Sequence, residues 1–110
     1  MLFRSERSDR LARNEAMFRS VNERVEEVVQ PGAEEQIDFL CECGDTACAE
    51  KMTLTREEYE QVRADGAQFA VHPGHEIPEI EEVVLRAERF FVVRKLPHEA
   101  EIAEETDPRS

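Results

Sequence analysis

The sequence predicts an α+β fold: a long N-terminal helix followed by a small antiparallel sheet with one short helix and a zinc-binding turn. Three observations lead to this prediction. Apolar residues recur at helical spacing over residues 6–29, short β-rich runs follow from residue 37 onward, and all three cysteines lie between residues 41 and 48. We divide the chain into an amphipathic helix over residues 1–32, a small zinc-binding α+β domain over residues 33–96 and an acidic tail over residues 97–110.

The chain has 110 residues, which is enough for one small domain with a modest core. Its net charge of −12 is unevenly placed. Residues 1–30 carry six arginines and six acidic residues, whereas residues 31–110 carry eight basic and twenty acidic residues. Because an acidic surface repels phosphate groups and anionic lipids, we expect neither nucleic acid nor a membrane as a partner.

The N-terminal segment carries charge from Arg4 onward, unlike a secretory signal peptide, and the sequence has no apolar run that could span a bilayer. We therefore expect a cytoplasmic protein. Thiols stay reduced in the cytoplasm, and three cysteines cannot all pair as disulfides. The cysteine count therefore favours metal ligation.

The first predicted helix covers residues 6–29, with Ser5 or Ser8 as its N-cap and Pro31-Gly32 as its end. Two interpretations of its apolar seam stay open. The seam can pack on the domain's own sheet, or it can form a coiled-coil contact with a protein partner or a second copy. Asn14 and Asn22 lie near the seam and are expected to be solvated. The predicted contact residues are Leu11, Phe18, Val21, Val25 and Val28.

Strands are expected at residues 37–42 and 51–54, on either side of the cysteines. A short helix follows the second strand. Thr55 and Glu58 have the spacing of a capping box, and Asp65-Gly66 is typical of a helix end. We expect the buried side of this helix to carry Tyr59 and Val62.

A third strand is predicted at residues 68–72 and is ended by Pro73-Gly74. Residues 77–96 fit either a helix or a hairpin. The density of aromatic and β-branched residues in the second half favours a hairpin with strands at 82–86 and 90–95.

From Pro97 onward the chain is acidic and short of large apolar residues, so we expect a loosely held tail. His98 lies in this tail and is expected to be an ordinary exposed residue.

The three cysteines form the predicted zinc site. In an extended segment Cys41 and Cys43 point to one face, and the turn at Gly44-Asp45 carries Cys48 back toward them. Zinc suits three thiolates and one imidazole because it is borderline soft and accepts a tetrahedral set of sulfur and nitrogen ligands.

The fourth ligand is expected to be His75 or His72, which flank the turn Pro73-Gly74. We favour His75 because it stands just past the turn, whereas His72 can project to solvent from the strand. The competing interpretation is that Cys41 is a buried apolar side chain and that no metal binds.

Several motifs occur together along most of the chain. They are Phe39-Leu40-Cys41-Glu42-Cys43 followed by Cys48, Leu54-Thr55-Arg56-Glu57-Glu58-Tyr59-Glu60-Gln61-Val62-Arg63, Phe69-Ala70-Val71, Pro73-Gly74-His75-Glu76, Val92-Val93-Arg94-Lys95, Arg13-Asn14-Glu15 and Phe18-Arg19-Ser20-Val21-Asn22-Glu23. With these motifs the chain resembles an uncharacterised family of small actinobacterial proteins. The resemblance implies no activity, but it indicates that the cysteines and His75 belong to one group of side chains.

Three classes of function fit these observations. The leading hypothesis is a non-enzymatic, zinc-stabilised regulatory or adaptor protein that binds another protein or itself through the N-terminal helix, because a filled Cys₃His site is closed and structural. The alternative is a thiol-based zinc redox switch. A small zinc hydrolase is the third: it needs His75 off the metal and Glu42 or Glu76 as the base, although both acids are expected to be solvated.

Overall fold

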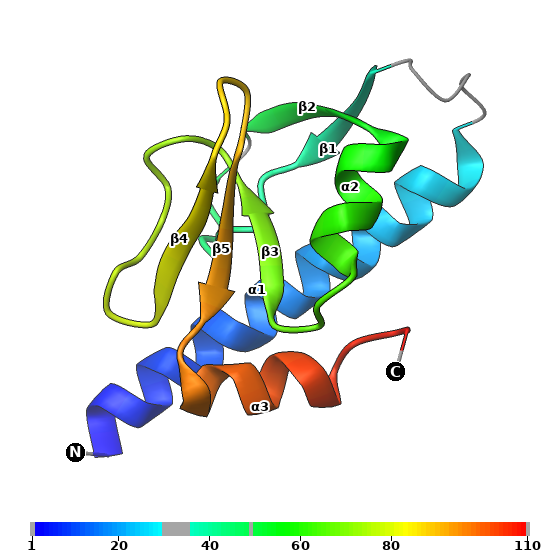
Figure 1. Cartoon of the computed structure of the whole chain (residues 1–110). Coiled ribbons are helices and arrows are strands. Elements are labelled where there is room, and N and C mark those ends of the chain that lie inside the picture. The colour runs from blue at the N-terminus through cyan, green and yellow to red at the C-terminus, as the bar shows by residue number, and fades with distance from the viewer. Residues whose placement is uncertain (1, 30–35, 49, 110) are drawn as a thin grey trace.

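The computed structural model describes residues 2–29, 36–48 and 50–109, with side chains described from residue 9 onward. Its elements confirm the predicted α+β fold (Figure 1). In chain order they are α1 (Leu2–Val28), β1 (Gln36–Leu40), β2 (Lys51–Thr55), α2 (Arg56–Arg63), β3 (Gln68–Val71), β4 (Glu81–Arg86), β5 (Phe91–Lys95) and α3 (Pro97–Glu105). The predicted end of the first helix at Pro31-Gly32 lies outside the described residues, and Ser5 and Ser8 lie inside α1 instead of capping it.

The strands form two antiparallel sheets. One pairs β1 with β2, and the other has the order β3-β5-β4. The predicted hairpin is confirmed as β4 and β5, with a register shift between Val83 and Leu85. The segment after β1 links the two sheets, because the Glu42 backbone N–H donates a hydrogen bond to the Ala70 carbonyl of β3 at 2.9 Å. The cysteine loop therefore begins where the two sheets meet.

The main apolar core is formed by β1, β2 and α2 together with Ala70 of β3 and Val92 of β5. The Phe39 ring stacks on the Tyr59 ring with a centroid distance of 4.3 Å, and Leu54 is fully buried beside them. The predicted capping box starts α2: the Glu58 N–H donates to the Thr55 hydroxyl at 3.1 Å, and the Thr55 N–H donates to the Glu58 carboxylate at 2.8 Å. This local prediction is confirmed.

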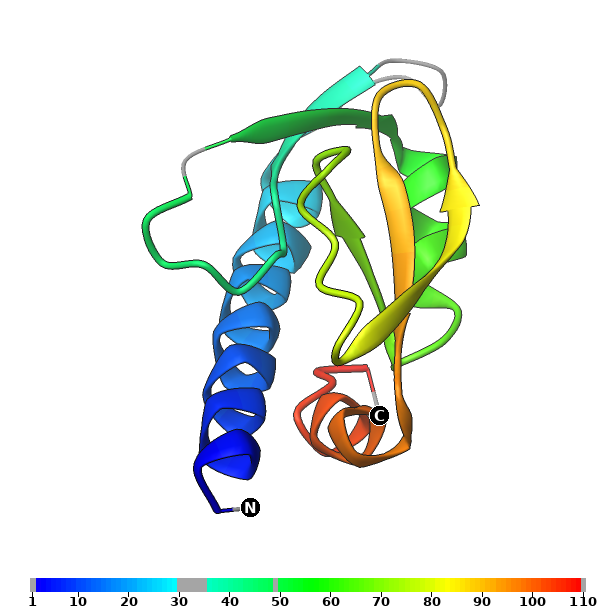
Figure 2. The same ribbon diagram turned by 90° about the vertical axis from the view of Figure 1, so that its left-hand side faces the viewer.

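The expectation of a loosely held tail is wrong. Residues Pro97–Glu105 form α3, which lies against α1 (Figure 2). Ala103 is fully buried and Ala100 is nearly so, while α1 contributes the buried Ala12 and Ala16. Small side chains let two helices approach closely, so buried alanines can hold α3 on the protein. His98 is exposed, as expected, and its Nε2 lies 2.9 Å from Asp9 Oδ1 of α1.

Charged side chains tie the C-terminal residues to α1 and α2. Arg63 donates from Nε to Glu23 Oε2 at 2.6 Å and also pairs with Asp107. Arg109 donates to the same Glu23 oxygen at 2.7 Å and to Glu60 Oε2 at 2.8 Å. The residues that follow α3 are therefore part of the packed structure.

The buried face of α1 differs from the predicted seam. Val21 and Val28 are 41% and 66% exposed, whereas Val25 packs against the main core. Helix residues advance by about 100° each, and on that basis the buried face is rotated by about 120° from the seam. The buried residues of α1 are Ala12, Glu15, Ala16, Arg19, Asn22 and Glu26.

Polar side chains can occupy this buried face because each finds partners elsewhere in the chain. Arg19 donates to the Gly66 and Ala103 carbonyls at 2.6 and 2.7 Å, and its guanidinium carbon lies 4.4 Å from the Phe69 ring centroid. Glu15 accepts a hydrogen bond of 2.5 Å from Lys95, and both side chains are fully buried. These partners are distant in sequence, and so the seam prediction missed this face.

Candidate metal centre

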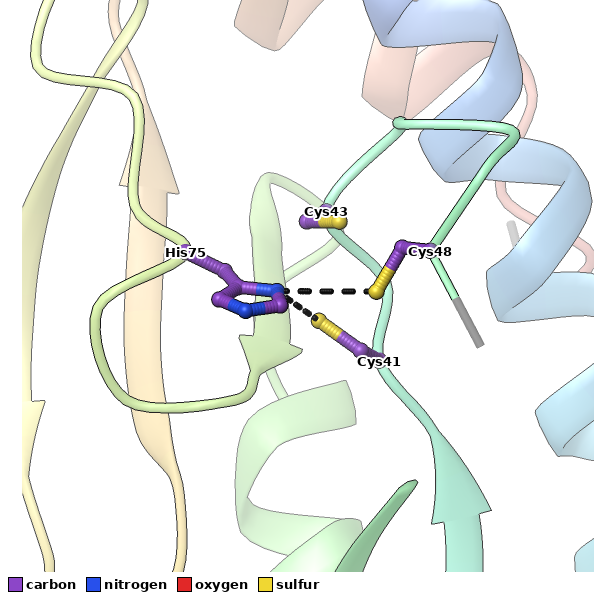
Figure 3. A group of neighbouring side chains, drawn as sticks. All are labelled: Cys41, Cys43, Cys48 and His75. Carbon is purple, nitrogen blue, oxygen red and sulfur yellow. Dashed lines mark hydrogen bonds between the residues drawn. The ribbon is translucent and has the colours of Figure 1, made fainter. Parts of the chain in front are cut away.

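The structure brings Cys41, Cys43, Cys48 and His75 together in one cluster (Figure 3). Their ligand atoms all lie within 4.8 Å of one another, and this group can hold a metal ion. Cys41 and Cys43 are buried, and Cys48 and His75 are half-buried. The three cysteines come from the loop between β1 and β2, and His75 comes from the loop between β3 and β4.

The distances within the cluster fit the edges of a tetrahedron. His75 Nδ1 lies 3.5 Å from Cys41 Sγ and 3.5 Å from Cys48 Sγ. A tetrahedral zinc ion with bonds of about 2.3 Å to sulfur and about 2.0 Å to nitrogen places those ligand atoms about 3.5 Å apart. These two nitrogen–sulfur pairs therefore have the spacing that a four-coordinate ion requires, and the remaining donor atoms lie within 4.8 Å of them.

The turn between Cys43 and Cys48 has the predicted chemistry. Gly44 adopts a φ of 84°, in the left-handed region that glycine accepts without strain. Asp45 Oδ1 accepts a hydrogen bond of 2.9 Å from the Ala47 N–H, and the Cys48 N–H donates to the Asp45 carbonyl at 2.9 Å. These bonds return Cys48 to the side of Cys43.

The same turn rests directly on α1. Asn14 Nδ2 donates a hydrogen bond of 3.0 Å to the Gly44 carbonyl. A Cβ added at Gly44 would lie 2.9 Å from both the Leu11 carbonyl oxygen and Glu15 Cγ, which is closer than real Cβ contacts allow. Gly44 is thus required both for its backbone angle and for its contact with the helix.

We predict that Gly44→Ala lowers the free energy of unfolding by more than Gly74→Ala. Both glycines have positive φ, at 84° and 92°, so both variants should lose about 1–2 kcal/mol from backbone strain. Only the Gly44 substitution also collides with α1, because nothing lies within 4 Å of a Cβ at Gly74. Denaturant unfolding of the two variants measures the difference. Equal losses would show that contact with α1 does not constrain Gly44.

His75, and not His72, contributes its ring to the cluster. The His75 N–H donates to the His72 carbonyl at 2.9 Å across the Pro73-Gly74 turn, which turns the His75 ring toward the sulfurs. The His72 ring lies outside the cluster, with Nδ1 3.1 Å from the Pro73 carbonyl. His72 instead donates its backbone N–H to Cys41 Sγ at 3.1 Å. A donated N–H stabilises a thiolate, so His72 supports the site through its backbone.

The thiols of the cluster influence one another's ionisation. A hydrogen bond from the Cys41 thiol, helped by one from the Asp45 backbone, lowers the pKa of Cys43 to about 5. The same hydrogen bond to Cys43, together with burial, raises the pKa of Cys41, and burial raises that of Cys48. Without a cation the cluster therefore favours a thiolate at Cys43. A bound cation stabilises thiolates at all three positions.

Glu42 and Asn22 correct two expectations of solvated side chains. The Glu42 carboxylate is fully buried, on the opposite side of the strand from the sulfurs. It accepts hydrogen bonds from Asn22 Nδ2 at 2.8 Å, from the Tyr59 hydroxyl at 2.9 Å and from the Ala70 N–H at 3.0 Å, and burial raises its pKa. Asn22 also donates to and accepts from the Leu40 backbone, at 2.8 and 2.9 Å. Both residues hold the end of β1 and the start of the cysteine loop against α1.

Comparison of the chain with protein families, with curated proteins and with solved structures gives no match. The resemblance to small actinobacterial proteins therefore stays a prediction. Among the residues that the structure describes, no helix is both long and apolar enough to cross a bilayer.

Proposed function

We propose that this chain is a non-enzymatic, zinc-stabilised regulatory or adaptor protein of the cytoplasm that contacts a protein partner through α1. One observation carries the metal part of the proposal. Three sulfurs and one imidazole nitrogen lie within 4.8 Å of one another, at separations that suit a tetrahedral ion. Four protein ligands leave no position for substrate or water, and such closed sites are structural.

Zinc is the metal that this donor set suits best, because soft thiolates and an imidazole match its borderline character. The positions of the donors explain what the ion would do. Cys41, Cys43 and Cys48 belong to the loop that joins the strands of one sheet, and His75 belongs to a loop of the other sheet. An ion held by all four would join the two sheets as a cross-link.

Single substitutions test the ligand set. Cys43→Ser and Cys48→Ser should abolish zinc binding, and His75→Ala should weaken it by more than about tenfold, the usual minimum cost of losing a residue that only supports a ligand. His72→Ala is the matched control, because its ring lies beside the His75 ring, with centroids 4.9 Å apart, but outside the cluster. Competition against a chromogenic chelator gives the affinities. If the two histidine variants bind zinc equally, His75 is not a ligand.

A redox switch is the second candidate, and two observations favour it. Cys48 is half-buried and so accessible from solvent, and the pKa of Cys43 is lowered to about 5. Two thiolates and hydrogen peroxide would take up two protons and give one disulfide and two water molecules, with release of the ion. Zinc retention under mild peroxide distinguishes the candidates, since a purely structural site keeps its metal.

The hydrolase hypothesis loses support from the position of Glu42. Its carboxylate already accepts three hydrogen bonds in the interior, so it cannot act as a base toward a metal-bound water. Glu76 is half-buried beside His75 and is the remaining candidate acid. The result expected of a structural site is that neither the wild type nor His75→Ala, both loaded with zinc, hydrolyses ester or phosphate substrates.

The partner part of the proposal concerns α1. Val25 packs on the protein's own core, and Leu11 and Phe18 are half-buried, so the predicted seam is not available as one surface. Val21 and Val28 remain exposed. A partner or a second copy would therefore meet α1 on the side that carries these two valines.

A further inference from the structure

The outward side of α1 combines apolar and basic side chains. Met17, Val21 and Val28 are 52%, 41% and 66% exposed and lie on one side of the helix. Exposed arginines lie beside them. Together these residues form what we call the outward face, which consists of Arg10, Arg13, Met17, Val21, Arg24 and Val28. At about 100° per residue, all six lie within an arc of about 80° around the helix axis.

Among the described residues of α1, most acidic side chains are buried or paired, whereas three of the four arginines are exposed. The acidic Glu15 and Glu26 are buried, and Glu23 pairs with Arg63 and Arg109. The exposed charges that flank the apolar residues are three arginines and one acid, Glu27. A helix whose sequence is close to neutral therefore presents a positive face, on a protein whose net charge is −12.

The arginines of this face differ from most other arginines of the protein. Arg63, Arg89 and Arg94 each form an ion pair with a carboxylate. Within the part of the chain that the structure describes, the side chains of the outward-face arginines Arg10, Arg13 and Arg24 have no hydrogen bond or ion pair. With respect to the described side chains, their guanidinium groups can therefore meet carboxylates of another molecule.

We propose that the outward face of α1 binds an acidic amphipathic helix of another protein. This inference rests on the protein-binding part of the proposed function and names the chemistry of the partner. Met17, Val21 and Val28 follow one side of the helix at the spacing that packs against a second helix, and the arginines beside them match carboxylates that flank its apolar stripe.

Charge argues against a second copy as the occupant. Two outward faces in contact would bring together six arginines, with only one copy of Glu27 beside each face to oppose them. Like charges across an interface disfavour the pairing. Residues 10–28 extend over about 27 Å of helix, which supports a small interface. We therefore expect transient, salt-sensitive binding.

The test uses a labelled synthetic helix of about 20 residues, long enough to match residues 10–28, with leucines along one side and glutamates flanking them. A second peptide has lysine in place of every glutamate. Fluorescence anisotropy measures the binding of both to the zinc-loaded protein at low and moderate salt. The acidic peptide should bind at least about tenfold more tightly than the basic one, and its affinity should fall as salt screens the arginines.

Two double variants with the same net charge test the location. Arg13→Glu with Arg24→Glu changes the outward face, whereas Lys51→Glu with Arg86→Glu changes exposed residues on β2 and β4. The first should weaken binding of the acidic peptide by about tenfold or more, and the second by no more than about twofold. Equal weakening by both variants would overturn the proposal, because the effect would then come from net charge alone.

Two further results would also overturn it. One is binding of the wild type to phosphatidylserine vesicles, but not to the peptide, since the face would then be a membrane surface. The other is a dimer by light scattering that Arg13→Glu with Arg24→Glu dissociates. Zinc content is measured in every sample. If the zinc-loaded protein fails to bind the acidic peptide, this inference alone is overturned. If the purified protein contains no metal and still binds the peptide, only the metal proposal is contradicted.

Discussion

Removal of zinc is expected to lower the free energy of unfolding by at least about 3 kcal/mol, because the binding energy of a structural zinc is also folding energy. For a domain of this size, such a loss corresponds to a decrease of about 10–20 °C in the melting temperature. The physical reason is local. Without the ion, Cys41, Cys43 and Cys48 no longer hold His75, and the two sheets lose their cross-link.

The loss of stability on zinc removal should extend to α1, because the cysteine loop forms part of the surface on which α1 packs. Asn14 donates to the Gly44 carbonyl, and Asn22 exchanges two hydrogen bonds with the Leu40 backbone. Hydrogen exchange before and after chelation measures the effect. We expect faster exchange in residues 41–48 and in α1, and little change at the capping box of α2. A confirmed metal-free protein with unchanged melting temperature would make the cysteines ordinary core residues.

Lys95→Met is expected to give the largest loss of stability outside the metal centre. The Lys95 ammonium lies 2.5 Å from Glu15 Oε2 and also pairs with Glu81, and all three side chains are fully buried at the contact between α1, β4 and β5. Removing one partner of a buried ion pair typically costs about 3–5 kcal/mol, because the remaining charges stay buried without compensation.

The loss should depend on pH. Burial raises the pKa of Glu15 well above its usual value, so the folded protein holds a proton that the unfolded chain releases as pH rises. Lys95→Met removes the group that opposes this shift, and its cost should therefore be larger near about pH 8 than near about pH 5. Adding Glu15→Gln and Glu81→Gln should recover part of the stability. Denaturant unfolding at both pH values measures this, and a pH-independent loss below about 1 kcal/mol would contradict the account.

Features that depend on neighbouring residues could be predicted from the sequence. The Thr55–Glu58 capping box, the turn at Gly44-Asp45 and the hairpin of β4 and β5 each depend on side chains a few positions apart. The grouping of the three cysteines also follows from local geometry, because the turn at Gly44-Asp45 returns Cys48 to the other two, whereas His75 reaches them from 27 positions away. Such interactions need no knowledge of distant partners.

Features that depend on distant partners could not be predicted. Arg19 is buried because Gly66 and Ala103 offer it carbonyl oxygens, and Glu15 is buried because Lys95 meets it, from eighty positions away. Apolar periodicity contains no information about such pairs. It therefore selected a seam on α1 that differs from the buried face. Glu42 was a partial exception: its alternation with two cysteines already placed it on the opposite face, where the Tyr59 hydroxyl needs an acceptor.

The central claim is that Cys41, Cys43, Cys48 and His75 hold one zinc ion. Zinc K-edge X-ray absorption on tag-free protein, combined with elemental analysis, tests it most directly. The expected result is about one zinc per chain, with three sulfur ligands at about 2.3 Å and one nitrogen ligand at about 2.0 Å. Oxygen ligands from water, or a folded protein of full stability that contains no zinc, would contradict it.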